Sequence, residues 1–204
     1  MLFNTGHDSL RIMVMAIGGG ASSAINRMVT IDHNKAVSIA VDTDKVDLEH
    51  SIATHRLQLV VDKAKGKDAF GSPDALKKAI KESRGDILTL LGGVDVLLIV
   101  ACMGGNTGTG TAPLIGQIAR EQGIRTIGVV ASSFLLEGKS RKHRADEGAA
   151  RFSENVDALV SIPTERLIGL VDKGTPIQDV FRFIDELLVE YVHGIVALLT
   201  VLPE

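Results

Sequence analysis

Residues 94–113 read VDVLLIVACMGGNTGTGTAP, an aliphatic run that passes directly into a loop rich in glycine and threonine. The run 94–101 predicts a buried strand, because aliphatic residues follow one another almost without polar alternation. The glycines let the backbone come close to a phosphate, and Thr107 and Thr109 add hydroxyl donors. Residues 111–113 then open a helix, whose N-terminus attracts anions. The stretch therefore predicts a strand, a phosphate-binding loop and a helix, in that order.

The N-terminal part of the chain has a related but weaker pattern. A strand expected over 10–17 precedes GGGASS at 18–23, and a helix is expected over 21–30. Ser23 stands where the dinucleotide-binding fingerprint has its third glycine, and Asp42 or Asp44 follows the second strand, where such a site has its ribose-binding acid. An NAD-type dinucleotide-binding oxidoreductase is therefore one hypothesis. It gives no reason for the second glycine-rich loop, and no pattern of a hydride-transfer site accompanies it.

The chain alternates between strand and helix patterns. Further strands are expected at 36–41, 57–61, 124–131 and 157–162, and helices at 73–91, 112–122 and 139–155. Ser72 is a suitable N-cap, with Pro73 at the first helical position. This alternation predicts an α/β fold with a doubly wound, mostly parallel sheet and helices on both faces.

The last predicted element is a long helix from about residue 175 to residue 201. Its apolar residues recur at three- and four-residue steps, which places them on one face, but 195–202 is apolar nearly all round. We expect residues 1–174 to form a nucleotide-binding α/β domain. Residues 175–204 are expected to be a central helix that would lead to a second domain absent from this chain.

The composition excludes some classes of function. The 204 residues carry 22 Lys and Arg against 25 Asp and Glu, so no basic field favours nucleic acid as a partner. Cys102 is the only cysteine, which fits a reducing compartment. No apolar stretch has the length of a bilayer-spanning helix. The sequence predicts a cytoplasmic protein with no direct membrane insertion.

The glycine-rich loop has a close parallel in a known family. Residues 104–110, GGNTGTG, resemble GGGTGTG, the signature of the tubulin/FtsZ GTPase family. Residues 25–28, 41–44, 136–141, 162–167 and 171–176 also resemble segments of FtsZ, and they occur in the same order. The resemblance covers almost the whole chain. It implies a GTP-binding cytoskeletal protein, similar to that of bacterial cell division, that assembles head to tail into filaments with GTP hydrolysed at subunit contacts.

The resemblance also implies roles for individual residues. The residues implied around the phosphates are Gly19, Gly20, Ala21, Ser22 and Ser23, then Asp44, then Gly104, Gly105, Asn106, Thr107, Gly108, Thr109 and Gly110. Glu137 and Arg141 would contact the ribose and phosphate region, Thr164 would lie near the guanine or ribose, and Phe181 would pack on the base. Asp185 would accept hydrogen bonds from guanine N1 and N2, and adenine lacks both donors. The implied ligands are GTP and GDP, with Mg²⁺ as a further expectation.

The sequence departs from the family pattern at several positions. Asn106 replaces a glycine where left-handed backbone is expected, and Asp42 and Thr164 replace asparagines. Phe70 is bulky in a loop expected to face the γ-phosphate. The acidic segment that completes hydrolysis in the family is expected just beyond residue 204, so no residue of this chain is assigned to catalysis. Expected partners are other copies of the chain or complete FtsZ subunits, and a non-hydrolysing module that joins such subunits is a further hypothesis.

Overall fold

The computed structural model describes residues 10–31, 36–61, 72–169, 172 and 174–201. The described residues form a six-stranded, entirely parallel sheet in the order β3-β2-β1-β4-β5-β6. The strands are β1 (Ile12–Ile17), β2 (Val37–Asp42), β3 (His55–Gln58), β4 (Val96–Cys102), β5 (Arg125–Ala131) and β6 (Ala158–Ile162). The doubly wound parallel sheet expected from the sequence is confirmed.

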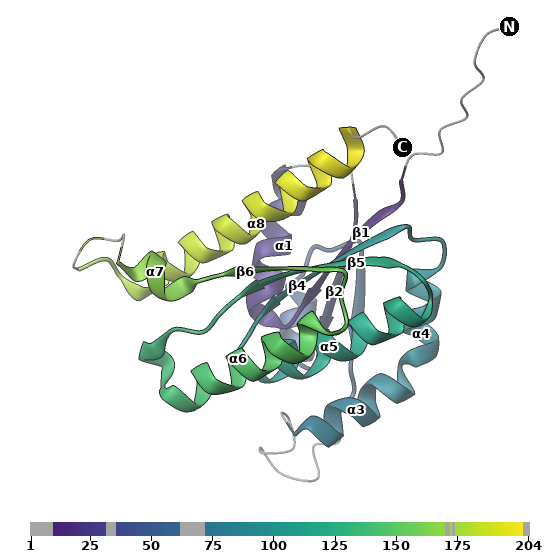
Figure 1. Cartoon of the computed structure of the whole chain (residues 1–204), viewed down its shortest axis with the longest axis horizontal. Coiled ribbons are helices and arrows are strands. Elements are labelled where there is room, and N and C mark those ends of the chain that lie inside the picture. The colour runs from purple at the N-terminus through teal and green to yellow at the C-terminus, as the bar shows by residue number, and fades with distance from the viewer. Residues whose placement is uncertain (1–9, 32–35, 62–71, 170–171, 173, 202–204) are drawn as a thin grey trace, which may run out of the picture.

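Helices cover both faces of this sheet (Figure 1). They are α1 (Gly19–Ile31), α2 (Lys45–Glu49), α3 (Pro73–Glu82), α4 (Arg84–Leu91), α5 (Asn106–Glu121), α6 (Lys139–Ser153), α7 (Thr164–Ile168) and α8 (Ile177–Val201). Alternate residues of β1 enter two different cores, Met13 and Met15 facing α3 to α6 while Val14 and Ala16 face α1, α2 and α8. Because both faces of the central strands are buried, these strands are aliphatic throughout.

Helix boundaries differ from the expected ones where small polar residues interrupt a pattern. The helix expected over 73–91 is two helices, α3 and α4, which meet at Ser83, two residues before Gly85. Ser72 caps α3 by accepting a hydrogen bond from the Ala75 N–H at 3.2 Å, as expected. Strand β3 begins at His55 rather than at residue 57. The short helices α2 and α7 were not expected, and Phe70 lies outside the described residues.

The long helix α8 packs one face on the sheet beside α1 (Figure 1). Its buried face repeats at helical spacing through Ile184, Leu188, Val192 and Val196. An ion pair between Arg27 of α1 and Glu186, at 2.7 Å, joins the two helices. Within the part of the chain that the structure describes, no helix has the length and apolar character needed to cross a membrane.

Candidate functional site

A cleft of about 450 Å³ lies at the C-terminal edge of the sheet, where the chain order reverses between β1 and β4. Helix α1, which follows β1, covers one face of the sheet, and α5, which follows β4, covers the other. The first turns of the two helices therefore diverge and leave a crevice, the usual place for a ligand in a doubly wound sheet. The ends of β2 and β5 and the first half of α8 complete its walls.

One end of the cleft is formed by two glycine turns, the first of which packs against the first turn of α5. Gly18, with φ 88°, ends β1, and a Cβ there would lie 3.4 Å from the backbone nitrogen of Gly108. Gly104, with φ 99°, makes the corresponding turn after β4. Helix α5 starts after Gly105 with no side-chain cap, and α1 starts directly at Gly19. The first N–H groups of both helices lack partners within the helix, so this end of the cleft suits an anion.

A wall of carboxylates faces these two helix starts. Asp42 at the end of β2 accepts hydrogen bonds at Oδ1 from the N–H groups of Thr43 at 2.7 Å and Asp44 at 3.2 Å, and from the Thr107 hydroxyl at 3.3 Å. Burial raises the pKa of Asp42, and the nearby Asp47 of α2 adds to the rise. Asp44 caps α2 by accepting from the Val46 N–H at 2.8 Å.

The opposite end of the cleft combines aromatic rings with an acid. Phe134, after β5, and Phe181 of α8 meet edge to face with their ring centres 5.7 Å apart. Asp185, one helical turn after Phe181, also lines this end. Burial raises the pKa of Asp185 to about 6, while Arg27 lowers it and Glu186 raises it further. A flat ring with N–H donors on its edge would find both an apolar surface and an acceptor here.

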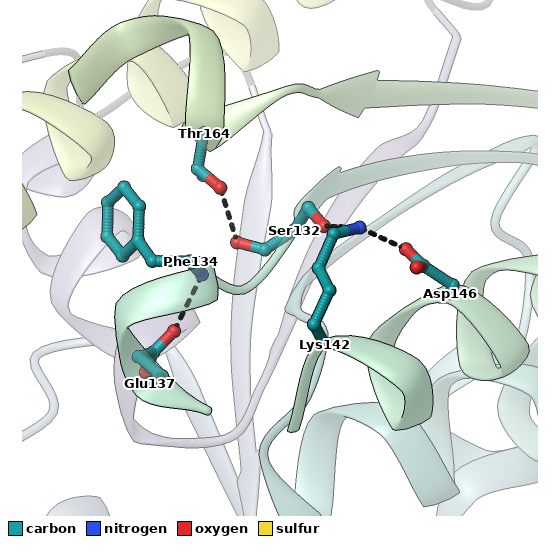
Figure 2. Close-up of polar contacts among 6 residues, drawn as sticks. All are labelled: Ser132, Phe134, Glu137, Lys142, Asp146 and Thr164. Atoms are coloured by element: carbon teal, nitrogen blue, oxygen red, sulfur yellow. Dashed lines mark hydrogen bonds and ion pairs between the residues drawn. The ribbon is translucent and has the colours of Figure 1, made fainter. Parts of the chain in front are cut away.

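The loop between β5 and α6 forms the side wall, and hydrogen bonds hold it in place (Figure 2). Glu137 accepts from the Phe134 N–H at 2.9 Å and pairs with Arg141 at 3.0 Å. Thr164 donates its hydroxyl proton to the carbonyl oxygen of Ser132 at 3.1 Å. Lys142 contacts both the Ser132 hydroxyl, at 3.3 Å, and Asp146 (Figure 2). These contacts fix the position of Phe134 against the cleft.

The structure brings to the cleft wall eleven of the residues that the family resemblance implies around the nucleotide. They are Gly19, Gly20, Ser23, Asp44, Gly105, Asn106, Thr107, Glu137, Arg141, Phe181 and Asp185. Asn106 does not have the left-handed backbone expected for it, because it begins α5; all positive φ values in the described residues belong to glycines.

The remaining residues that the resemblance implies lie outside the cleft lining, and two of them are seen to shape the loop behind it. They are Ala21, Ser22, Gly104, Gly108, Thr109, Gly110 and Thr164, none of which is in the cleft lining of the described residues. Thr109 accepts a hydrogen bond from the Gly104 N–H at 2.7 Å and so holds the turn. A Cβ on Gly108 would lie 2.8 Å from the carbonyl oxygen of Cys102, so this glycine lets α5 lie directly on the strand ends.

Several lining residues were not singled out in the sequence. Asp47 was missed because α2 was not expected. Ser132, Ser133 and Phe134 directly follow a predicted strand, and they could have been found because ligands bind at the C-terminal ends of parallel strands. Cys102 also lines the cleft, and desolvation raises the pKa of its thiol to about 12. The thiol therefore stays protonated at neutral pH and is a poor nucleophile.

The described residues do not fit a metal site made by protein side chains alone. They contain no group of three or more His, Cys, Asp or Glu side chains that could hold a metal ion. Mg²⁺ that is bound mainly through nucleotide phosphates needs only one or two protein carboxylates, so its presence at this site stays a prediction.

Comparison with known proteins agrees with this geometry. The family model described as the Tubulin/FtsZ family, GTPase domain, matches residues 11–172. An FtsZ dimer structure from M. jannaschii shares 32% sequence identity at a TM-score of 0.85, and the match covers 96% of this chain and 57% of that one. The chain thus spans less than two thirds of this relative's length.

Two more distant structures share the fold. CetZ2 from Haloferax volcanii, in a GTPγS-bound protofilament, has 15% identity and a TM-score of 0.75, and the match covers 92% of this chain and 58% of that one. TubZ from Clostridium botulinum phage c-st has 16% identity and a TM-score of 0.67, with 90% and 58% covered.

Proposed function

The chain belongs to the tubulin/FtsZ family of GTPase domains, and from this premise we propose that its cleft binds GTP and GDP. One observation carries the proposal. Two glycine-rich helix starts lie at one end of a cleft whose other end holds a carboxylate beside two phenyl rings. This arrangement suits a guanine nucleotide, with phosphates at the helix starts and the base at Asp185.

The chemistry of binding follows from these groups. Free N–H groups at the starts of α1 and α5 donate to phosphate oxygens, and the helix dipoles favour the negative charge. Phe181 offers its ring to one face of the base. The Asp185 carboxylate accepts from guanine N1–H and the 2-amino group, whereas adenine would leave this partly buried acid without a partner.

A titration with four nucleotides tests the proposal. The protein should bind GDP, bind ADP and NADH far more weakly, and bind inosine diphosphate with intermediate affinity, because inosine lacks the 2-amino group but keeps N1–H. Asp185→Ala should weaken GDP binding by about 1–3 kcal/mol and abolish the difference between GDP and inosine diphosphate. Binding of ADP as tight as that of GDP would rule out the role of Asp185.

The dinucleotide-oxidoreductase hypothesis has less support from the geometry. Its ribose-binding acid would be Asp42 or Asp44. Asp44 already accepts from the Val46 N–H as the cap of α2, and Oδ1 of Asp42 accepts from two loop N–H groups and the Thr107 hydroxyl, so Oδ2 of Asp42 is the acceptor left for a ribose. The NADH arm of the titration decides between the two readings. Tight NADH binding with no GDP binding would favour the oxidoreductase.

We further propose that this cytoplasmic protein associates with copies of itself, or with complete FtsZ subunits, into filaments that serve cell division. The support comes from the relatives, an FtsZ dimer and a CetZ2 protofilament. Sedimentation with a complete FtsZ should show co-pelleting that depends on GTP. Phosphate release measured on this chain alone should show negligible GTP hydrolysis, since no residue here is assigned to catalysis. If the chain stays in the supernatant under all conditions, the assembly proposal fails while nucleotide binding stands.

A further inference from the structure

The phosphate end of the cleft contains an unusual balance of charges. Two helix starts attract an anion, yet the carboxylates of Asp42, Asp44 and Asp47 line the same end. The carboxylate of Asp47 lies over the first residue of α1: the point where a Cβ on Gly19 would lie is 2.5 Å from its Oδ2 and 3.9 Å from Oδ2 of Asp42. A phosphate that approaches Gly19 must therefore meet both acids.

Asp42 is the acid that cannot move away. Only 3% of the residue is exposed, and Oδ1 is held by the hydrogen bonds from Thr43, Asp44 and Thr107 described above. Its other oxygen, Oδ2, is buried and has no hydrogen-bond partner. A buried polar atom without a hydrogen-bond partner costs free energy. A ligand that forms a hydrogen bond with Oδ2 would remove this cost.

The charged groups around Asp42 do not neutralise it. Asp47 of α2 is an acid, and Asp44 follows in the same loop. The facing starts of α1 and α5 contribute Gly19, Gly20 and Thr107, which do not titrate, and Cys102 at the end of β4 is a protonated thiol. Across the cleft, the described basic group is Arg141, which is paired with Glu137. A bound phosphate would add another anion to this set.

We propose that Asp42 binds a phosphate of the nucleotide as a neutral carboxylic acid, with a proton on Oδ2 that is donated to a phosphate oxygen. This inference rests on the proposed nucleotide binding. The phosphate takes the place of the exposed Asp47 carboxylate above Gly19, and one proton is taken up from solvent. Apart from the O–H bond that this proton forms with Oδ2, no covalent bond forms or breaks. Oδ1 keeps its present donors, and Oδ2 gains the partner that it lacks.

Burial already raises the pKa of Asp42 before any ligand arrives, so protonation of this acid costs less free energy than it would in water. The negative charge of the phosphate raises it further. Binding should therefore take up about one proton at pH 8, where the terminal phosphate of free GDP, with a pKa near 6, is already deprotonated. In alkaline solution, GDP affinity should fall about tenfold per pH unit.

Isothermal titration calorimetry of the whole chain with GDP tests this, at pH 8, with a chelator, in two buffers of different ionisation enthalpy. The difference in heat between the buffers should correspond to the uptake of about one proton. Asp42→Asn should take up none and should keep or increase GDP affinity at pH 8 to 9. Its amide oxygen can still accept the loop hydrogen bonds, and its NH₂ group supplies the donor permanently.

Asp44→Asn is the matched control. It removes the same charge from the same loop, and asparagine caps a helix as well as aspartate does. This variant should bind GDP more tightly at every pH and still take up the proton.

GDP binding by the natural chain without proton uptake would overturn the inference and leave the proposed function standing. Binding that fails in chelator, returns with Mg²⁺ and is lost in Asp42→Asn would also overturn it, because Asp42 would then be a cation ligand. Absence of GDP binding under all conditions would overturn the proposed function, and this inference with it. Circular dichroism checks that each variant is folded. Even if a variant does not fold, the proton uptake measured for the natural chain decides whether Asp42 becomes protonated.

Discussion

At the scale of the single residue, Asp185 shows how an acid proposed to bind a ligand can weaken the fold that holds it. Burial raises its pKa from 3.8 to about 6, so the folded protein disfavours the charged form more than the unfolded chain does. The charge is stabilised only partly by Arg27, which is itself paired with Glu186. At neutral pH this acid therefore lowers the free energy of unfolding of the ligand-free protein.

The stability of the ligand-free protein should depend on pH through this residue. Below its ordinary pKa of 3.8, Asp185 is mainly protonated in both states and has little effect through its charge. As the pH rises through about 6, the folded state must carry a disfavoured charge, so stability falls. Asp185→Asn should raise the free energy of unfolding at pH 7 by about 1–2 kcal/mol and leave it nearly unchanged at pH 4. Urea unfolding at both values checks this, and equal changes at both would contradict it.

GDP affinity should have an acid limb that depends on the same carboxyl. As the pH falls below about 6, Asp185 takes up a proton and loses an acceptor for the guanine edge, so binding weakens. Fluorescence titration from pH 5 to 7 should show this loss in the natural chain. In Asp185→Asn the affinity should be lower at pH 7 and should change much less with pH, since the remaining change comes from the nucleotide's own phosphates. Parallel curves for the two proteins would count against the assignment.

At the scale of the element, α5 shows where local sequence preference is overridden. Its first five residues, NTGTG, are poor helix formers, and the sequence predicted a loop as far as residue 111. They are helical because the glycines let the first turn lie on the ends of β1 and β4, and because Thr109 holds the Gly104 turn. The loss of helix propensity is thus offset by close packing. A prediction from sequence pattern includes the helix propensity but not the packing.

Replacing either of two helical glycines by alanine should change the stability of the protein, in opposite directions for the two sites. Gly148 of α6 packs against α5, where an added Cβ would overlap Cγ2 of Thr109, so Gly148→Ala should destabilise the protein by about 1–3 kcal/mol. Gly194 lies within α8 with nothing within 4 Å of an added Cβ, so Gly194→Ala should stabilise it by about 0.5–1 kcal/mol. Thermal unfolding of the two variants checks the prediction. A loss of stability in Gly194→Ala would mean that this face of α8 is covered.

At the scale of the whole molecule, the sequence predicted the arrangement of layers better than the atoms of the site. Alternating strand and helix patterns were enough for a parallel sheet with two covered faces, and hence for a cleft at its C-terminal edge. The position of Asp47 could not be predicted, because it depends on α2, a helix of five residues with one buried side chain. The unpartnered oxygen of Asp42 depends on how the β2 and α5 loops meet, which no local pattern contains.

The pairing of β1 with β4 has a consequence for the order in which the molecule assembles. The register joins Ile12 to Val96, so half the chain must be synthesised before the sheet's centre can close, and both glycine turns depend on that closure. Contacts between such distant residues form late and slowly. GDP should therefore slow unfolding, by stabilising only the finished molecule, and leave the refolding rate unchanged. Stopped-flow kinetics with and without GDP would reveal this, and faster refolding with GDP would mean that the two halves of the cradle meet before the rate-limiting step.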